Sequence, residues 1–451
     1  MKNKIKSLIA ILAAAAVLPA GAAESAPGKI WDLGDCMVYA IEHNFDARRK
    51  LIDQNDYKQN YINQFASHFP SLSAGGGGGF SFGRGVDPAT NTYETTSNFG
   101  NSYSISGGMT LFNGFALINQ TRAAKIARLS GAKEQQQVED RIALGTMAAY
   151  VKVVYCKRLV ELAHEQLTEK SEMLRQSRRE MELGTKSFAD VAQLEADAAG
   201  AEYEVITSEN NLQVAVLELK DQMNYPIDDS LEVEPEMEQV PLYEEGQTPE
   251  DIFQAAAQLI PDIQIAKYAL DQYELYYKAT KAQMYPSFSM SGGISTNYFT
   301  DLDKEKRNKM AYFRALDTNL GESVGFSMSI PIFGNLGRRT QTYKARNSVT
   351  RSKIALEEKS REIRSEIEKA VMDLNSAEQK FTQAEKKVAA TELAYRVTRR
   401  KFEEGLQTAI DLQASYNQML TSRIEYAYSQ LELIAKRRQV NYYKGVPLVS
   451  F

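Results

Sequence analysis

Two related halves make up this sequence, and that duplication limits how the chain can fold more than any other feature. Short motifs recur about 221 residues apart: Leu111-Phe112 returns as Ile332-Phe333, Gly184 with Asp190 returns as Gly405 with Asp411, and Tyr225-Pro226 returns as Val446-Pro447. A unit of this length is a duplicated half-protein rather than a solenoid repeat. We therefore expect a pseudo-twofold arrangement within one chain.

The first residues indicate export from the cytoplasm. Three lysines precede an apolar run from Leu8 to Leu18, and small residues follow as far as Ala23. This order is typical of a secretory signal peptide, here residues 1–23, with cleavage near Ala22 or Ala23. Its removal changes the formal charge from -5 to roughly -8. An acidic mature chain argues against a nucleic-acid partner, because phosphate binding needs excess positive charge.

Four segments alternate with the period of a β-strand. Residues at about 101–112 place apolar side chains against Ser, Gly and Thr, and about 322–333 repeats this phase. The other two strands are expected at about 71–83 and 287–299, and the polar segments Arg84 to Gly100 and Phe299 to Gly321 are expected to be external loops. A soluble sandwich with one wet face gives the same alternation. The exported chain and strand lengths of about ten residues favour a membrane barrel.

Four strands cannot close a barrel alone. Open edges in lipid leave unpaired backbone groups that cost several kcal/mol each. Several chains are therefore expected to share one barrel in an outer membrane, held there by strands and by no lipid anchor.

Each strand pair is followed by a long helical hairpin, at about 115–224 and about 338–442. The first helix of each hairpin would reach roughly 100 Å at 1.5 Å per residue, and a shorter helix returns along it. The apolar residues of the first helices alternate steps of four and three, which predicts a left-handed supercoil. The seam residues are Ile363, Ile367, Ala370, Leu374, Ala377, Phe381, Ala384, Val388, Tyr395 and Phe402, matched in the first half by Ile142, Thr146, Ala149, Val153, Cys156, Val160, Ala163, Leu167, Leu174 and Met181.

Shorter helices complete the pattern. The returning helices cover only half of the long ones, so helices at about Leu33 to Phe69 and Pro249 to Tyr285 are expected to cover the rest. The chain then divides into a first repeat, 24–226, an inter-repeat linker or belt, 227–248, and a second repeat, 249–451 with a short C-terminal tail. Acidic residues and two prolines in the linker interrupt both repeats.

No residue pattern predicts catalysis, a cofactor or a metal site. His43, His68 and His164 are dispersed, which favours surface residues over ligands. The Gly75–Gly79 run lacks a following Gly-Lys-Ser/Thr, so a flexible or closely packed strand is favoured over a phosphate loop. Cys36 and Cys156 are expected to be free, buried thiols. We expect no enzyme activity.

The chain resembles the TolC-like outer membrane efflux proteins, the outer membrane factors of tripartite efflux systems, over nearly its whole mature length. Helix-to-strand junctions at Phe69-Pro70-Ser71-Leu72 and Tyr285-Pro286-Ser287-Phe288 carry the resemblance. So do strand-to-helix junctions at Leu111-Phe112-Asn113-Gly114 and Pro331-Ile332-Phe333-Gly334, and the glycine turns between the long helices. The resemblance implies a homotrimer with a twelve-stranded barrel, four strands per chain, continued by a periplasmic coiled-coil tube.

Function and partners follow from that resemblance. It implies a channel-tunnel that serves as the passive exit duct of a tripartite efflux or type I secretion system, gated at its periplasmic tip. It also implies a periplasmic adaptor that links the tip to an inner-membrane pump. The adaptor-contacting turns would be Gly184, Thr185 and Lys186 in the first hairpin, and Gly405, Leu406, Gln407 and Thr408 in the second.

Two acidic residues are candidates for the gate. Asp190 and Asp411 open the returning helices, where the helix dipole stabilises a carboxylate by roughly 0.3 to 1 kcal/mol. By resemblance, Asp411 of three chains would also form an acidic ring at a constriction. The sequence departs from the family where some members have a second acidic ring, a Tyr and an Arg; here Ala414, Phe402 and Gln407 stand. A pore-less periplasmic adaptor or envelope scaffold is the alternative, but it would not need the four alternating strands.

Overall fold

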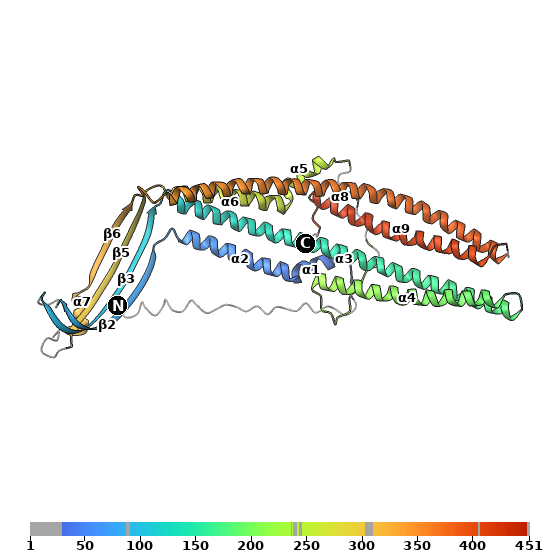
Figure 1. Cartoon of the computed structure of the whole chain (residues 1–451), viewed down its shortest axis with the longest axis horizontal. Coiled ribbons are helices and arrows are strands. Elements are labelled where there is room, and N and C mark those ends of the chain that lie inside the picture. The colour runs from blue at the N-terminus through green and yellow to red at the C-terminus, as the bar shows by residue number, and fades with distance from the viewer. Residues whose placement is uncertain are drawn as a thin grey trace.

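The structure is a computed structural model that describes residues 29–86, 91–235, 237, 241–242, 246–302, 310–404 and 406–448. The chain is elongated, with a β-sheet at one end, helices along its length and two helical hairpin tips at the other end (Figure 1). The predicted signal peptide, residues 1–23, lies outside the described residues, and so does Gly405. None of the helices in the described ranges has the length and apolarity that a membrane span requires.

The sheet has four antiparallel strands in the order β2-β3-β5-β6. They are β2 (Ser71–Val86), β3 (Tyr93–Phe112), β5 (Ser287–Asp301) and β6 (Gly321–Ser329). Within the described residues, β2 and β6 are the two outer strands, each paired along one side. Strands from the first half thus lie beside strands from the second half.

Several predicted strand bounds are wrong. Pairing runs up to Val86 and Tyr93, so most of the predicted loop from Arg84 to Gly100 is strand, because threonine and aromatic residues extend the ladder. The predicted loop from Phe299 to Gly321 contains a short helix, α7 (Tyr312–Thr318). Strand β6 ends at Ser329 rather than near residue 333, since Pro331 has no N–H to donate to a ladder.

The two long helices have the predicted length. Helix α3 (Ala116–Glu182) and helix α8 (Gly337–Glu403) have 67 residues each, and α8 begins and ends 221 residues after α3. The returning helices are α4 (Phe188–Met223) and α9 (Ala409–Tyr443), whose starts are also 221 residues apart. All predicted seam residues on α3 and α8 are buried or half-buried, which confirms the 3.5-residue pattern.

The two helices that precede the strand pairs are each broken in two, which corrects the prediction of continuous helices. The first is divided into α1 (Leu33–His43) and α2 (Phe45–Ala66), because Asn44 caps α2 through its side chain, which accepts from the Asp46 N–H at 2.8 Å. The second is divided into α5 (Pro249–Leu259) and α6 (Pro261–Ala282), since Pro261 cannot donate a helical hydrogen bond to α5.

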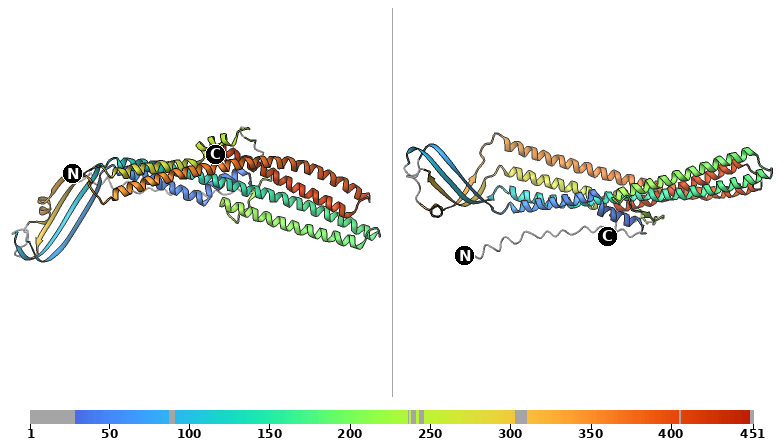
Figure 2. Two further views of the ribbon diagram at one scale, coloured as in Figure 1. Left: turned by 45° about the horizontal axis from the view of Figure 1, so that its top comes forward. Right: turned by 90° about the horizontal axis from the view of Figure 1, so that it is seen from below.

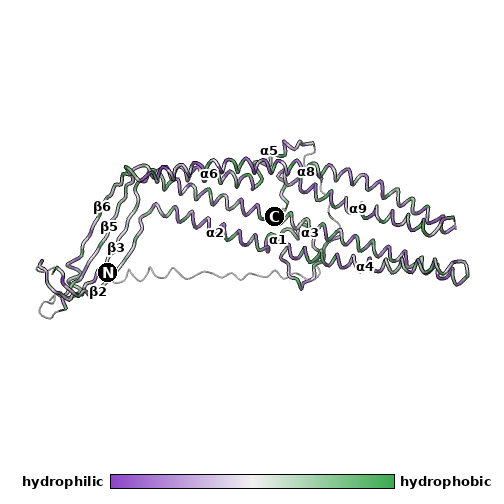
Figure 3. Tube along the Cα trace, viewed as in Figure 1, coloured by the Kyte–Doolittle hydropathy of each residue, from purple (hydrophilic) through white to green (hydrophobic). Residues whose placement is uncertain are grey.

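The shorter helices cover the two long helices in sequence along the molecule, as predicted. Helices α2 and α6 lie along the sheet-proximal halves of α3 and α8, and α4 and α9 lie along the distal halves (Figures 1 and 2). Helix α6 packs against both α3 and α8, which joins the two halves of the chain. Hydrophilic and hydrophobic residues are interspersed along all of these helices (Figure 3), because each turns only a stripe towards its neighbour.

The linker between the halves is tied to the middle of the molecule. Within it, β4 (Glu232–Val233) pairs in parallel with β1 (Ile30–Trp31), a contact that the sequence did not predict. The Tyr150 hydroxyl donates to the carbonyls of Trp31 and Glu234, each at 3.4 Å. Trp31 and Val233 of this strand pair belong to a hydrophobic core that also contains Cys36 and Met147.

Both cysteines are free and buried, as predicted. Cys36 lies in the core at the middle of the molecule, and Cys156 lies on the seam of α3. Burial raises the pKa of the Cys36 thiol to about 12, so the thiolate that would react with an oxidant is scarce at neutral pH.

Each strand-to-helix junction contains a residue pair in the left-handed region. In the first junction, Gly114 has φ of +67° and Phe115 has φ of +68°; in the second, Asn335 has +48° and Leu336 has +59°. Asn335 stands 221 residues after Gly114, and asparagine is one of the few side chains that adopt this conformation at modest cost. A Cβ at Gly114 would also lie 2.8 Å from the Ala282 carbonyl oxygen, in contact with the end of α6.

We predict that Gly114→Ala lowers the stability of the detergent-solubilised protein. The left-handed backbone costs a side-chain-bearing residue roughly 1–2 kcal/mol, and the carbonyl of Ala282 adds a clash. Gly334→Ala is the matched control, because its backbone is not left-handed and its nearest neighbour would be the flexible Arg338 side chain at 3.1 Å. Thermal loss of helical circular dichroism at one scan rate measures both; equal midpoints for the two variants would contradict this account.

Candidate functional site

The first hairpin turn is a tightly capped helix end. The N–H of Gly184 donates to the Met181 carbonyl and the N–H of Thr185 to the Glu180 carbonyl, each at 2.9 Å. With φ of +77° at Gly184, these bonds form a Schellman motif, so this glycine is a helix C-cap as expected. Lys186 follows, and its ammonium lies 3.4 Å from the Glu180 carboxylate. The turn is therefore rigidly built.

The second hairpin turn has the same design in the residues that the structure describes. The Leu406 N–H donates to the Lys401 carbonyl at 2.7 Å, the bond equivalent to that of Thr185. Gln407 follows, and its Oε1 is buried without a hydrogen-bond partner among the described residues. Gly405 itself lies outside the described range.

The two candidate gate residues both stand in the first turn of a capped helix. Asp190 and Asp411 occupy the third positions of α4 and α9, and their backbone N–H groups donate to Ser187 and Thr408, each at 3.2 Å. The Asp411 carboxylate also accepts from the Thr408 hydroxyl at 2.8 Å and from the Thr408 N–H at 3.2 Å, a complete capping box. These bonds lower the pKa of Asp411, so its charge persists to lower pH than that of an ordinary aspartate.

The two hairpin tips enclose a groove of about 900 Å³. Lys186 of the first tip lies over the ring of Phe402 at the end of α8, 5.1 Å from its centroid. This contact joins the two hairpins at the tip. The sequence alone did not indicate which residues would hold the tip closed. Phe402 supplies a cation–π partner in place of a hydroxyl, an interaction of roughly 0.5–1 kcal/mol at an exposed site. The groove is lined by predicted tip residues from both turns, including Thr185, Lys186, Asp190, Gln407 and Thr408.

A polar cluster joins α3 to the second hairpin further from the tip. The Tyr395 hydroxyl donates to the Glu169 carboxylate at 2.5 Å, and the Arg399 guanidinium lies 3.6 Å from the same carboxylate. Arg423 of α9 bridges Glu165 of α3 at 2.9 Å and Glu392 of α8 at 2.8 Å. Sequence reasoning placed Tyr395 on the seam but missed its hydroxyl contact, because Glu169 belongs to the other half of the chain.

A buried lysine lies beside this cluster. Lys170 is only 2% exposed, and its ammonium has no hydrogen-bond partner among the described residues. The Asp197 carboxylate lies 3.9 Å away, and the Tyr416 ring centroid lies 5.4 Å away. Burial lowers the pKa of Lys170, and it raises the pKa of Tyr416 to about 12. The packing between the hairpins thus buries an ammonium group that has lost its hydration without gaining a hydrogen bond among the described residues, which is costly while the group is charged.

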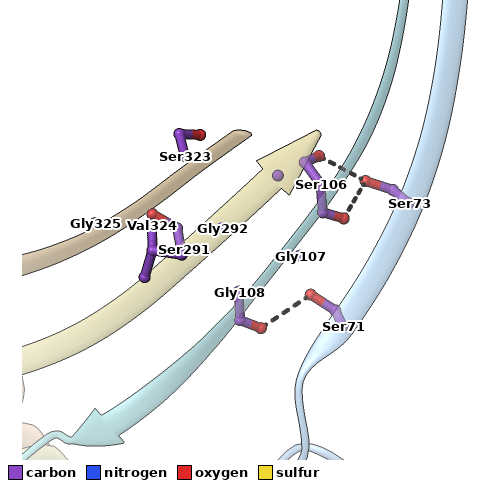
Figure 4. A pocket seen from close by; sticks show the side chains of 11 residues that line it. Ser71, Ser73, Ser106, Gly107, Gly108, Ser291, Gly292, Ser323, Val324 and Gly325 are labelled. Atoms are coloured by element: carbon purple, nitrogen blue, oxygen red, sulfur yellow. Dashed lines mark hydrogen bonds between the residues drawn. The ribbon is translucent and has the colours of Figure 1, made fainter. Parts of the chain in front are cut away.

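The sheet has one face of hydroxyls and glycines. Ser71, Ser73 and Ser106 come together with small residues of β5 and β6, and the Ser73 and Ser106 hydroxyls lie 3.2 Å apart (Figure 4). The opposite face carries Leu72, Ile105, Ile294 and Val324 around a shallow apolar hollow. This separation fits a sheet with lipid on one side and water on the other.

No group of three or more His, Cys, Asp or Glu side chains within the described ranges is placed to hold a metal ion. The three histidines lie apart. His43 contacts the Tyr39 carbonyl, His68 contacts the Thr121 hydroxyl, and His164 lies 3.3 Å from the Glu209 carboxylate.

Comparison with known proteins identifies relatives over nearly the whole chain. Residues 38–224 and 252–443 match the sequence model of a family described as "Outer membrane efflux protein". The outer membrane efflux protein BepC of Brucella suis biovar 1 (strain 1330) is 22% identical over 431 residues, covering 94% of this chain and 87% of BepC.

Solved structures share the fold. The outer membrane protein VceC of Vibrio cholerae superposes with a TM-score of 0.78 at 14% identity, covering 92% of this chain and 96% of VceC. The open state of the MtrE outer membrane channel of Neisseria gonorrhoeae gives a TM-score of 0.73 at 17% identity, covering 92% of this chain and 89% of MtrE.

We predict that Tyr395→Phe loosens the contact between the hairpins. The hydroxyl's hydrogen bond to a carboxylate is worth roughly 1.5 kcal/mol in this partly exposed setting, which corresponds to about a tenfold increase in local opening. Hydrogen–deuterium exchange in the segments around Glu169 and Arg399 measures it. Tyr426→Phe is the control, because that hydroxyl on α9 has no hydrogen-bond partner among the described residues; equal exchange in both variants would contradict the contact.

Proposed function

The chain belongs to the outer membrane efflux protein family, and from that premise we propose that three copies form one continuous exit duct across the outer membrane and into the periplasm. Each copy would contribute its four strands to a twelve-stranded barrel and its helices to a tube wall. The duplicated halves would then act as six similar units around the duct. Both strand pairs lie within the family match, which a pore-less scaffold would not require.

The observation that carries this proposal is the pair of unpaired sheet edges. The family lies in the outer membrane, where a free strand edge leaves backbone groups without water or partners, at several kcal/mol each. Strands β2 and β6 present such edges in the described part of the sheet. Because β2 and β6 run in opposite directions, β6 of one copy can pair antiparallel with β2 of the next until the ring closes.

Exposed apolar stripes on the helices support the same assembly. On α4, Tyr203, Ile206, Val214 and Leu217 are exposed and fall within a stripe about 80° wide at 100° per residue. On α8, Met372, Leu393 and Val397 form a second stripe. Both stripes are exposed in the part of the chain that the structure describes, and neighbouring copies in a closed tube would cover them.

The tips supply the surface for an adaptor protein. Leu183 and Phe188 of the first turn and Leu406 and Ile410 of the second are exposed, although all are large and apolar. Leu183 and Phe188 flank the predicted contact residues Gly184 to Lys186, and Leu406 is itself one of the predicted contact residues Gly405 to Thr408, which Ile410 follows. We infer that a periplasmic adaptor covers these side chains and links the duct to an inner-membrane pump. The pump would choose the cargo, because the strand wall offers mainly neutral hydroxyl groups.

The gate would be closed by contacts between the hairpins. Lys186 over Phe402 holds the tip, and Tyr395 with Arg399 on Glu169 holds the next turns. Adaptor binding at the tip would open the duct by separating the two hairpins. In a trimer, Asp411 would add three carboxylates near the constriction and favour cations.

We predict that the purified protein conducts ions in a planar bilayer with a preference for cations, and that Asp411→Asn reduces this preference. The amide removes the charge and retains an oxygen that can accept the Thr408 N–H. Asp251→Asn is the matched control, since Asp251 completes the same capping box with Thr248 at the start of α5, away from the hairpin tips. An equal effect of both variants would reduce Asp411 to a helix cap, and absence of conductance would contradict the duct.

The same recordings at falling pH test the physical state of Asp411. Because its folded pKa lies below the ordinary value, the charge is present at neutral pH and is lost only as pH falls through that lowered pKa. Removing the cap with Thr408→Val should shift the loss of cation preference to higher pH. An unchanged midpoint would exclude Asp411 as the titrating group.

A further inference from the structure

The glycine run Gly75–Gly79 lies on β2, an outer strand of the sheet, and the chain itself explains only part of it. On the apolar face, a Cβ at Gly76 would lie 2.8 Å from the Tyr103 ring, and one at Gly78 would lie 3.0 Å from the Asn101 side chain. Neighbouring residues on β3 therefore require these two glycines. The Tyr103 ring covers Gly76, as aromatic residues often cover glycines in sheets.

The alternate glycines on the hydroxyl face have no such reason within the chain. A Cβ at Gly77 or Gly79 would meet nothing within 4 Å, and one at Gly75 would only touch the Ser104 hydroxyl at 3.9 Å. None of the three has a positive φ. Glycine weakens a strand interior, so its presence here points to a requirement outside this copy of the chain.

The other outer strand carries bulky side chains that are largely exposed. Val324 is 73% exposed and Phe326 is 74% exposed, on the apolar face of β6. Strand β6 itself contains small residues on the hydroxyl face, Ser323, Gly325 and Ser327, which alternate with those bulky ones. One edge of the sheet is therefore rich in glycine, and the other presents projecting apolar side chains.

We propose that the Gly75–Gly79 segment is the seam between copies, on which β6 of a second copy pairs antiparallel with Val324 and Phe326 lying across it. This inference rests on the shared barrel proposed above and specifies where and how it closes. Glycine on both faces lets β2 coil inwards while the bulky side chains of β6 fill the space outside. The absence of side chains at Gly77 and Gly79 keeps the water-facing side of the seam open.

Sheet geometry gives the register. Within one chain, Ser71, Gly108, Ser291 and Gly325 form one row across the four strands. In a barrel the strands are tilted, so a row of paired residues that crosses four strands meets the next copy several residues further along its first strand. For strands about 4.8 Å apart, with a rise of about 3.3 Å per residue and a tilt of 35–45°, this shift is about four to six residues. Successive side chains point to opposite faces of the sheet, so only an even shift keeps the apolar faces of two copies on the same side. A shift of four or six residues from Ser71 places Gly325 opposite Gly75 or Gly77 of the next copy.

The ends of the strands give the direction of the shift. Strand β6 continues for four residues beyond Gly325 and ends at Ser329, whereas β2 begins at Ser71, in the row of Gly325. If the strand ends of neighbouring copies lie at the same height along the barrel axis, Ser71 of the next copy lies near Ser329. In either permitted register, Val324 and Phe326 lie across the segment Ala74–Gly78.

Disulfide mapping in the full chain tests the seam. In a Cys36→Ala and Cys156→Ala background, Gly325→Cys is combined with Gly75→Cys, Gly77→Cys or Ser71→Cys, and the membranes are oxidised. We expect covalent oligomers of up to three chains for one or both glycine pairs and none for Ser71, which would be at least four residues out of register. Oligomers of trimer mass that link only through Ser71, or through no pair, would overturn the seam and leave the duct intact. A protein of monomer mass would contradict the shared barrel itself.

Valine substitutions test whether the glycines serve the seam. We expect Gly77→Val and Gly79→Val to reduce the detergent-resistant oligomer at least threefold, because β-branched side chains restrict the coiling of the strand. Gly85→Val is the matched control, since a Cβ there also meets nothing within 4 Å but lies beyond the reach of β6 in both registers. Equal oligomer in all three variants would overturn the role of the glycines.

Discussion

Backbone hydrogen bonding in lipid is the constraint on which this structure depends. A strand edge in the membrane has no water to satisfy it, so a sheet of four strands must find further strands. The chain alternates its strand directions so that its two outer strands are antiparallel to each other. For a member of an outer membrane family, this geometry is the basis of the proposal that several copies share one barrel. The glycine run on one edge and the bulky residues on the other then acquire a common explanation.

In the proposed duct, the helices extend the same assembly away from the membrane. A 67-residue helix reaches roughly 100 Å and cannot bury its apolar stripe in a globular core. Successive shorter helices cover it instead: α2 then α4 on the first long helix, α6 then α9 on the second. The polar contacts of Tyr395 and Arg423 occur where the hairpins meet, and a tip that must open benefits from contacts worth only about 1–2 kcal/mol each.

Much of this fold was predictable because its main features are local or periodic. The seam from Ile363 to Phe402 follows from its spacing, and the strand-to-helix junctions ending at Gly114 and Gly334 were expected from the family resemblance. Helix breaks at Asn44 and Pro261 were missed, although capping and proline chemistry explain both. The β1–β4 pair and the contacts of Glu169 with Tyr395 join residues far apart in sequence, and no local pattern encodes them. Asp190 and Asp411 were predictable as first-turn residues of the returning helices; their role as a gate is part of the proposal.

In the proposed duct one chain provides a third of a closed wall, and the mass of the intact assembly shows how many chains complete it. Native mass spectrometry of the detergent-solubilised protein, released from its micelle, counts the chains without assuming where they meet. The account predicts a single species of three chains. A stable monomer would leave strand edges unpaired in the membrane, and a stable dimer would close at most eight strands; either result would contradict a twelve-stranded wall.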